Sequence, residues 1–327
     1  MTLYLIRRIL NYAILTLVAT SLAYVLASIG LVPERRFLQR NPPVPQSTID
    51  GILDRWGVNP EDPLLLRLFR WLGNLFTQGS LGLTTGNQPV VEEIFVRAGV
   101  SLQLLLVGSI IGAILGVILG VWGAVRQYRT SDRIVTAASY LLFATPTVVM
   151  AILLMILATY FNQAAGSQII RFTGQYSPGI PNEFWPQLGD RLSHLLLPTL
   201  VLILGAAASY SRYQRSAMLD VLGADYIRTA RSKGRTRGSA LVRHGVRVAL
   251  IPMSTFFAYS FGTLVAGATM LEIMFGWHGM GELTIQAVQQ DDINAVAGST
   301  MFVAVLILCS STLSEVLYAA LDPRVRR

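Results

Sequence analysis

The segment Ala224–Arg247, with the sequence ADYIRTARSKGRTRGSALVRHGVR, concentrates positive charge in a chain that is otherwise mostly apolar. It holds seven basic residues and a single acidic one, Asp225. Such a cluster can serve as a positively charged loop on the cytoplasmic face of a membrane, as a site for anionic lipid headgroups, or as a docking element for a cytoplasmic protein. None of these roles requires a reactive side chain. The spacing of the residues is therefore the feature that can distinguish them.

The spacing is that of a short amphipathic helix between Asp225 and Gly234. Asp225 is expected to cap the start of this helix, and Gly234 is expected to end it. Two rows of side chains result, an apolar row of Ile227, Ala230 and Gly234 and a basic row of Arg228, Arg231 and Arg235. This order of residues favours a docking helix over a loop that is merely charged.

Other residues give little support for catalysis. A phosphate-binding P-loop requires Gly-Lys followed by Ser or Thr, but the only lysine, Lys233, is followed by Gly234. No nucleophile elbow or metalloprotease motif occurs. His194, His244 and His278 are scattered along the chain, and the single cysteine lies in an apolar run. We therefore expect no catalytic, cofactor-binding or metal-ligating residue.

The composition indicates the environment in which the basic segment lies. Hydrophobic residues make up 53% of the 327 residues and charged residues only 13%, which is about half the usual charged fraction. One soluble core cannot bury so much apolar surface, and a lipid bilayer is the natural solvent for the rest. The net charge of +8 comes from clusters between apolar runs, a pattern typical of membrane topology rather than of nucleic-acid binding.

Six apolar stretches are long enough to cross about 30 Å of hydrocarbon, which takes roughly 20 helical residues. They lie near residues 9–32, 101–125, 134–161, 195–213, 248–272 and 293–321. The first is too long for the apolar core of a cleavable signal peptide, so it is expected to remain as a span. These stretches predict an all-α membrane protein with six transmembrane helices and one transmembrane domain over residues 1–327.

The basic residues indicate how the spans are oriented. Outside segment 224–247, arginines precede the first span, separate the second from the third and follow the sixth: Arg7, Arg8, Arg126, Arg129, Arg133, Arg324, Arg326 and Arg327. By the positive-inside rule, both termini and segment 224–247 are cytoplasmic. The long segment 33–99 is then extracytoplasmic and forms either a docking surface or a cap over the spans. Its stretch PLLLRLFRWLGNLF predicts a short helix that lies on the membrane or on the protein.

Glycines and ionisable residues indicate how the spans pack and work. A stripe of small residues recurs every four positions in the second span, at Gly108, Gly112, Gly116 and Gly120. A neighbouring helix can approach closely along such a stripe. Pro146, Pro198 and Pro252 can bend their helices. Ionisable residues are almost absent from the middle of the spans, since Glu272 and Glu315 lie towards the ends, which argues against an ion-coupled carrier.

Several segments carry a resemblance to a known family. They are GADYIRTARSKG (223–234) and LVRHGVRVALIP (241–252), followed by RWLGNLFTQGSLGLTTGNQPVVEEI, GVWGAVRQYRTSDR, HLLLPTL, EIMFGWHGMGEL and LYAALDPRVR. In combination they resemble the permease subunits of bacterial ABC importers for peptides, of the dipeptide/oligopeptide permease B type. The chain looks most similar to the oligopeptide permeases of mycobacteria. The resemblance extends over nearly the whole chain.

The resemblance implies a fold, a function and partners. It implies the type I ABC importer permease fold in a bacterial plasma (inner) membrane, with oligopeptides or dipeptides as cargo. A second homologous permease, two ABC ATPase domains that hold ATP and Mg²⁺, and an extracytoplasmic peptide-binding protein would complete the importer. The basic segment would supply the ATPase-coupling helix, formed by Asp225, Tyr226, Ile227, Arg228, Thr229, Ala230, Arg231, Ser232, Lys233 and Gly234.

The chain departs from the family pattern in two places. The general importer motif begins Glu-Ala-Ala, whereas Arg228, Thr229 and Ala230 stand here, and its later proline is displaced to Pro252. Many relatives have Pro-Gly where this chain has His278-Gly279. The second departure lies in a glycine- and aromatic-rich loop, which is a candidate outer gate or docking loop, or else an ordered turn. Its residues are Glu272, Phe275, Gly276, Trp277, His278, Gly279 and Gly281.

Other functions remain open at this point. The same fold could import nickel chelates, glutathione or small sugars. An ion-coupled carrier or a gated channel would work without ATP or partners, and it would normally need charges within the membrane. A membrane-anchored interaction protein would transport nothing.

Overall fold

The computed structural model of the protein describes residues 2–38 and 41–321, without the side chains of residues 2–6, 258–259 and 261–267. Regular structure in these residues is helical, apart from one antiparallel bridge between Leu83 and Pro89. The all-α class is thus as predicted. The basic residues Arg324, Arg326 and Arg327 lie outside the described residues.

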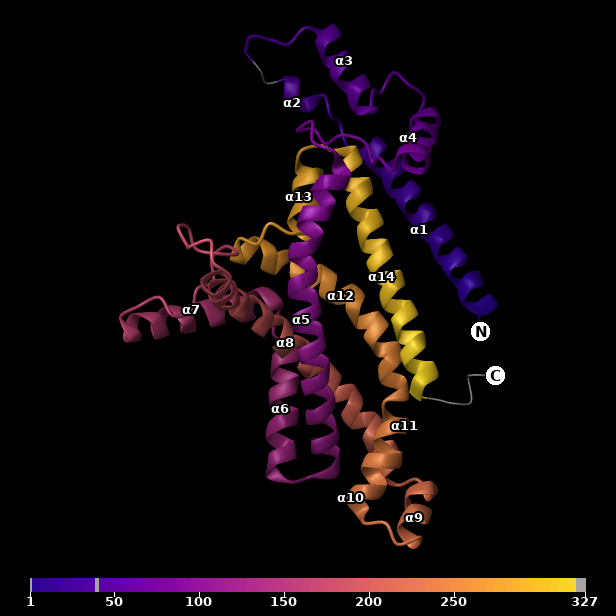
Figure 1. Ribbon diagram of the computed structural model, residues 1–327, viewed down its shortest axis with the longest axis vertical. Coiled ribbons are helices and arrows are strands. Elements are labelled where there is room, and N and C mark those ends of the chain that lie inside the picture. Colours follow the sequence, from indigo (N-terminus) through magenta and orange to yellow (C-terminus); the bar gives the residue numbers. More distant parts are fainter. Residues whose placement is uncertain (1, 39–40, 322–327) are drawn as a thin grey trace. The chain divides into compact units, whose positions relative to one another are not determined.

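Figure 1 labels the helices in chain order, apart from the turn η1. They are α1 (Thr2–Gly30), α2 (Arg35–Leu38), α3 (Gln46–Trp56), α4 (Leu64–Gln78), α5 (Val90–Val125), α6 (Thr130–Ala144), α7 (Thr147–Ala165), α8 (Phe184–Leu222), α9 (Asp225–Ser232), α10 (Arg237–Ala240), the π-helical turn η1 (Leu241–Val246), α11 (Arg247–Ala249), α12 (Ile251–Phe275), α13 (Met280–Gln289) and α14 (Ile293–Leu321). The chain divides into two compact units, Met1–Ser101 with His278–Leu308 and Leu102–Trp277 with Cys309–Arg327.

Five segments in the described part of the chain are long and apolar enough to cross a membrane. They are Arg7–Leu38, Val90–Val125, Thr147–Ala165, Phe184–Leu222 and Ile293–Leu321. The stretch predicted near 248–272 forms α12, which has 25 residues. A total of six spans therefore stays a prediction. The helix α8 is much longer than its predicted apolar stretch and continues unbroken through Pro198.

The apolar stretch near 134–161 contains two helices instead of one. Helix α6 ends at Ala144 and α7 begins at Thr147, and the two run in different directions (Figure 1). The cause is Pro146, because the residue before a proline is forced out of the helical region. Thr145 accordingly has φ −82° and ψ 121°. This change of direction creates the cavity described below.

The first unit is organised around a core that joins α1, α3, α4 and the start of α14. Tyr24, Leu53, Trp56, Trp71 and Ile293 are among its buried residues. Polar contacts fix the loop before α5 to α14, because the Asn294 amide donates to the carbonyls of Trp56 and Leu83, both at 2.9 Å. The helix predicted within segment 33–99 is α4.

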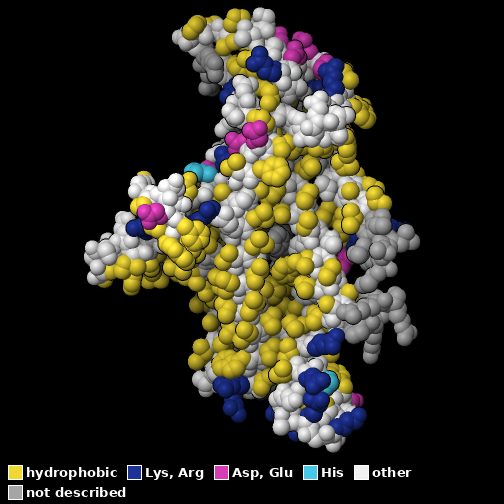
Figure 2. All heavy atoms as spheres, viewed as in Figure 1, with side chains coloured by type: hydrophobic (Ala, Val, Ile, Leu, Met, Phe, Trp, Pro, Cys, Tyr) yellow, Lys and Arg dark blue, Asp and Glu magenta, His cyan; other side chains and the backbone are white. Residues whose placement is uncertain are grey.

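The second unit is built around α8. Helices α5, α6, α7 and α12 pack along it. The elements α9, α10 and η1 lie at the end of α8 that the predicted topology places in the cytoplasm. Apolar side chains cover the long helices, whereas basic side chains gather over α9 and α10 (Figure 2). This distribution places the predicted docking segment beyond the apolar part of α8.

Candidate functional site

The helix α9 is anchored to its own chain by one apolar residue. Ile227 is only 3% exposed and packs with Met218 and Val221 of α8 and with Leu241 of η1. Ala230 lies partly buried against the same cluster. The apolar row predicted for this helix therefore faces the protein itself, and the opposite face remains available for other contacts.

The prediction for α9 is wrong at the start of the helix and correct at its end. Ala224 precedes the helix as its cap, with φ −70° and ψ 144°, and no side chain caps the start. The prediction that Asp225 caps the helix is wrong, because Asp225 is already the first helical residue. Gly234 has φ +86°, the left-handed conformation that glycine adopts at the ends of helices. The chain turns at Gly234, as its residue type predicts.

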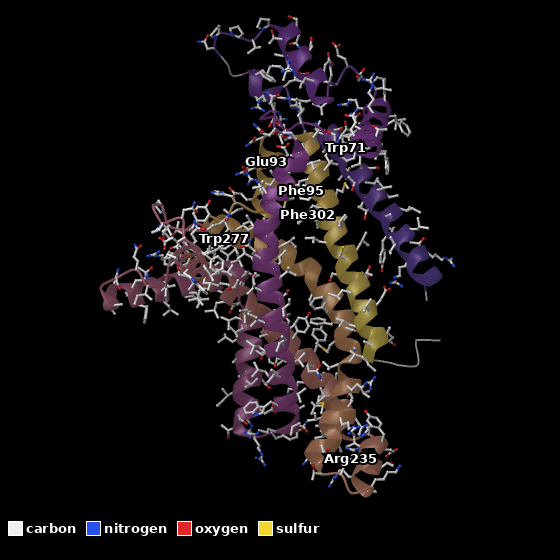
Figure 3. The ribbon with its side chains drawn as sticks, in the orientation of Figure 1. Trp71, Glu93, Phe95, Arg235, Trp277 and Phe302 are labelled. Carbon is white, nitrogen blue, oxygen red and sulfur yellow. The ribbon has the colours of Figure 1, made fainter. Side chains whose placement is uncertain are left out.

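The exposed side of α9 and of the turn that follows is polar and basic. Four cationic side chains are exposed there, on Arg228, Arg231, Lys233 and Arg235. Figure 3 labels Arg235 at this end of the unit, and Figure 2 shows the basic surface. Asp225 lies 3.8 Å from Arg228 but is 96% exposed, so it offsets little of this charge. The surface suits a partner that carries negative charge.

The segment after α9 connects it firmly to the long helices. The Thr236 hydroxyl accepts a hydrogen bond from the Ser239 N–H at 3.3 Å and so caps α10. In η1, a Cβ on Gly245 would lie 3.1 Å from a methyl group of Val221, so only a small residue lets η1 approach α8 this closely. Arg247 donates to the carbonyl of Leu321 at 3.1 Å, at the end of α14. Movement of the segment would thus be transmitted to two long helices.

An ion pair that the sequence analysis missed joins α6 to α8. Arg215 of α8 donates two hydrogen bonds of 2.8 Å to the two carboxylate oxygens of Asp132, which is 3% exposed at the start of α6. The Tyr128 N–H donates to the same carboxylate at 3.0 Å. The hydrogen bond from Arg215 holds the pKa of Asp132 below its usual range, so the pair stays charged at neutral pH. The partners are 83 residues apart, and no local pattern in the sequence connects them.

The glycine stripe of α5 lies directly against α8. A Cβ added at each glycine would meet α8 at 2.5–2.7 Å, with the contacts Gly108–Leu202, Gly112–Ala206, Gly116–Tyr210 and Gly120–Gln214. These distances are far below van der Waals contact, so larger residues would force the helices apart. Residue numbers rise together on both helices, which means that α5 and α8 run parallel. The predicted six-span topology requires the same direction for the second and fourth spans.

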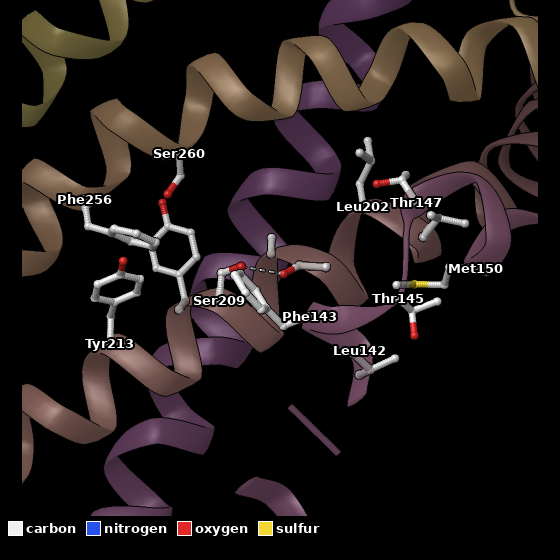
Figure 4. A pocket seen from close by; sticks show the side chains of 14 residues that line it. Leu142, Phe143, Thr145, Thr147, Met150, Leu202, Ser209, Tyr213, Phe256 and Ser260 are labelled. Atoms are coloured by element: carbon white, nitrogen blue, oxygen red, sulfur yellow. Dashed lines mark hydrogen bonds between the residues drawn. The ribbon is translucent and has the colours of Figure 1, made fainter. Parts of the chain in front are cut away.

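A cavity of about 420 Å³ opens where α6 gives way to α7 (Figure 4). Its walls come from both sides of the Pro146 break and from α8 and α12. Fourteen residues line it, and none is charged: Leu142, Phe143, Thr145, Thr147, Met150, Val201, Leu202, Gly205, Ala206, Ser209, Tyr210, Tyr213, Phe256 and Ser260. The centroid of the Phe256 ring lies 5.0 Å from that of the Tyr210 ring and 4.0 Å from that of the Tyr213 ring. Aromatic faces with hydroxyl groups between them suit a neutral organic guest.

The sequence analysis did not identify this cavity. One local signal was available, because Thr145-Pro146-Thr147 combines two hydroxyls with a helix break. The residues from α8 and α12 could be assigned to the cavity only from the packing of the helices.

The first half of the predicted gate loop turns inward. The helix α12 ends at Phe275, and Gly276 follows in the left-handed conformation with φ +66°. The Trp277 N–H donates to the Glu272 carbonyl at 2.7 Å and closes the turn. Glu272 is 1% exposed, and Phe275 and Trp277 are both fully buried. This burial favours an ordered turn over a docking surface.

The second half of that loop offers little more surface. His278 is exposed, and its Nδ1 lies 2.8 Å from a carboxylate oxygen of Glu282. Gly279 precedes α13, in which Gly281 is partly buried. The Met280 N–H donates to the Ser101 hydroxyl at 2.7 Å. Of the seven residues named for this loop, His278 is the exposed one.

A polar cluster holds the loop between α7 and α8. Asp190 of α8 is 6% exposed and accepts hydrogen bonds from the N–H and the hydroxyl of Ser177, at 2.7 and 2.9 Å, and from Arg171. The Nδ1 of the buried His194 lies 2.9 Å from the Asp190 carbonyl. These contacts fix the loop to α8. No group of three or more His, Cys, Asp or Glu residues suited to a metal occurs within the described side chains.

Comparison with known proteins agrees with this architecture. Residues 112–327 match the family described as "Binding-protein-dependent transport system inner membrane component". The chain is 50% identical over 326 residues to the oligopeptide transport system permease protein OppB of Mycobacterium tuberculosis (strain ATCC 25618 / H37Rv), covering 100% of this chain and 99% of the relative. It is 31% identical to the oligopeptide transport system permease protein AppB of Bacillus subtilis (strain 168), with 99% of each chain covered.

A relative named for dipeptides has a comparable identity over a shorter part of the chain. The dipeptide transport system permease protein DppB of Escherichia coli (strain K12) is 32% identical over 261 residues, covering 76% of this chain and 77% of the relative. The family match, the full-length similarity and the helices long enough to cross a membrane point to one conclusion. This chain belongs to the family of inner membrane components of binding-protein-dependent transport systems.

Proposed function

We propose that this chain is a permease subunit of an ATP-driven ABC importer that brings oligopeptides or dipeptides into a bacterial cell. The observation that carries the proposal is the similarity over the full chain to a protein named as an oligopeptide permease. Relatives with lower identity are also named for peptides, which favours peptides over nickel chelates, glutathione or sugars as cargo.

The importer requires partners that this chain does not supply. We expect a second, homologous permease to form a heterodimer with it and two ABC ATPase domains to bind ATP and Mg²⁺ on the cytoplasmic side. An extracytoplasmic binding protein would deliver the peptide. The family description supports a binding protein in general terms. Both termini would be cytoplasmic, in agreement with the basic residues around the predicted spans.

Helix α9 is the proposed contact with an ATPase. Its buried Ile227 would keep the helix attached to α8, while its outward face, with Asp225, Arg228, Thr229 and Ser232, would enter the cleft of the ATPase. Closure of the ATPases on ATP would move α9. Contacts through η1, Gly245 and Arg247 would pass this movement to α8 and α14.

The cavity at the Pro146 break is the proposed site of peptide contact in the spans. It lies between four helices of one unit, so a change in their packing would change its access. Its uncharged walls could accept apolar and neutral side chains, with Thr145, Thr147, Ser209 and Ser260 as hydrogen-bonding groups. Strict selection among peptides is expected to lie in the binding protein.

The test is uptake of a radiolabelled oligopeptide into proteoliposomes that hold the complete importer, with ATP on the side of α9. A Thr229→Trp variant places a bulky ring on the outward face of α9 and leaves Ile227 untouched. We expect it to lower uptake at least about tenfold, equivalent to about 1.4 kcal/mol. Gln127→Trp, at another exposed position on the same predicted side, is the matched control and is expected to transport normally.

The outcomes separate the competing functions. Uptake that needs ATP and that Thr229→Trp reduces in an intact complex supports a coupled permease. Uptake without ATP would identify a carrier or channel and would refute the proposal. Normal ATP-dependent uptake by Thr229→Trp would show that α9 is not the coupling element. ATP-dependent uptake of a radiolabelled nickel chelate, with no uptake of the oligopeptide by the same proteoliposomes, would overturn the assignment of the cargo.

A further inference from the structure

Helix α4 has three distinct faces along its length. One face is buried or partly buried in the first unit and consists of Leu64, Arg67, Leu68, Trp71, Leu72 and Leu75. At about 100° per residue, the next sector is exposed and apolar, with Leu65, Leu66, Phe69 and Phe76. The remaining sector is exposed and polar, with Arg70, Asn74, Thr77 and Gln78. A helix in contact only with water would not need an apolar sector that packs against nothing in its own unit.

The distribution of residues on α4 is the reverse of what water would select. The helix buries Arg67, which is 7% exposed and donates to the Val58 carbonyl at 3.0 Å. It leaves Leu65, Phe69 and Phe76 outside, at 64%, 67% and 69% exposure. Burial of an arginine is costly, and exposure of three large apolar side chains in water is unfavourable. The exposed leucine and phenylalanines suit a helix whose apolar sector is covered by an apolar medium.

The position of α4 on α1 indicates which medium this is. Trp71 packs on Tyr24 of α1, with ring centroids 5.3 Å apart, and Figure 3 labels Trp71 beside α1. Tyr24 precedes the end of α1 at Gly30 by about 9 Å along the helix axis. The helix α4 therefore lies alongside the last two turns of a membrane-crossing segment, near the depth at which headgroups meet acyl chains.

The side of α1 opposite Tyr24 is apolar and exposed at the same depth along the helix. Leu22, Leu26 and Ile29 recur at helical spacing on it, with exposures of 57%, 68% and 70%. A membrane-crossing helix presents such a stripe to lipid. Helix α4 packs on the Tyr24 side of α1 in the same compact unit. Because Leu22 and Leu26 flank Tyr24 along α1, lipid that covers this stripe reaches the depth at which α4 packs.

We infer that α4 is an interfacial membrane helix, with Leu65, Phe69 and Phe76 inserted among the acyl chains of the outer leaflet and Arg70, Asn74 and Thr77 facing the headgroups and water. The helix fastens the extracytoplasmic segment to the bilayer surface at the outer end of α1. This inference concerns the lipid environment and does not depend on peptide as the cargo.

The test uses the complete importer in nanodiscs. The single cysteine, Cys309, is replaced by serine, and one cysteine is introduced in turn by Phe69→Cys, Phe76→Cys, Asn74→Cys or Thr77→Cys. Each is labelled with the environment-sensitive fluorophore NBD, and a phospholipid with a doxyl quencher at acyl carbon 5 is then included. All four positions are exposed, so labelling leaves the core of the unit intact.

The inference predicts blue-shifted emission at positions 69 and 76, quenched by the doxyl lipid at least about twice as strongly as at positions 74 and 77. Unshifted emission without quenching at all four positions would place the helix in water and overturn the inference. Equally strong quenching at all four would also overturn it, because the polar sector would then lie in lipid too. Blue-shifted emission at 69 and 76 without quenching would mean that a partner protein covers the apolar sector, which also overturns it. The result does not depend on uptake, so a failure of peptide transport would leave the inference standing.

Discussion

Two short amphipathic helices, α9 and α4, bury one face against their own unit and differ in what they leave outside. Helix α9 is attached by Ile227 and exposes polar and basic side chains. Helix α4 is attached by Trp71 and exposes a sector of leucine and phenylalanine next to a polar sector. The buried faces explain why both helices stay in place. The exposed faces fit the two partners proposed above, a protein surface for α9 and lipid for α4.

The largest effect is expected from Ile227→Asp, which breaks the attachment of α9. The substitution removes a buried side chain and places a carboxylate in its apolar site, at a cost of about 5 kcal/mol or more. The segment should detach from α8 and become accessible to trypsin at its arginines, which gel electrophoresis can follow over time. Thr229→Asp puts the same charge on the exposed face and should leave the digestion rate unchanged. Equal digestion rates of the two variants would show that Ile227 does not hold α9 on α8.

A smaller effect is expected from Trp71→Ala, which tests the attachment of α4. Trp71 is 4% exposed, and its indole N–H donates to the Leu81 carbonyl at 3.0 Å. Truncation of such a residue costs about 3–5 kcal/mol, so the first unit should unfold at a lower temperature. Scanning fluorimetry of the purified importer would detect the shift. Trp185→Ala is the matched control, because Trp185 is 77% exposed, and a shift as large in this control would contradict the assignment.

The smallest effect is expected from Gly234→Ala, which changes only the turn after α9. Nothing lies within 4 Å of a Cβ at this position, so the cost comes from the backbone. A residue with a side chain at φ +86° is strained, and the strain lowers the stability of the turn by about 1–2 kcal/mol. The ATPase activity stimulated by the binding protein should fall moderately. Gly223→Ala also has open space but φ −90°, and it should match the wild type; a loss there as large as at Gly234 would refute the backbone explanation.

Much of the fold could be predicted because it follows from local patterns. Length and hydropathy predicted where the long helices lie. The four-residue repeat from Gly108 to Gly120 predicted a close helix contact, and the structure places α8 along it. Gly234 predicted the end of α9 from its conformational freedom alone. Each of these features depends on residues that are neighbours along one helix.

Features that depend on distant residues could not be predicted in this way. The apolar row of α9 was evident, but only the packing shows that Ile227 faces α8 and not a partner. The Asp132–Arg215 pair joins residues from two helices. A hydropathy profile also does not register a change in the direction of a helix. It therefore treated residues 134–161 as one span, although the chain turns at Pro146. The inward turn of Phe275 and Trp277 likewise depends on tertiary packing.

The break at Pro146 has a consequence for how a transporter could handle a varied cargo. The first N–H groups of any helix lack a carbonyl one turn earlier, and α7 begins its first turn at Thr147, in the wall of the cavity. Main-chain donors are therefore available in the wall of the cavity without any specialised side chain. Every peptide carries the same main-chain carbonyls, whatever its sequence. An interrupted helix can thus offer every peptide the same main-chain hydrogen bonds. Selection among side chains can then take place on a different protein.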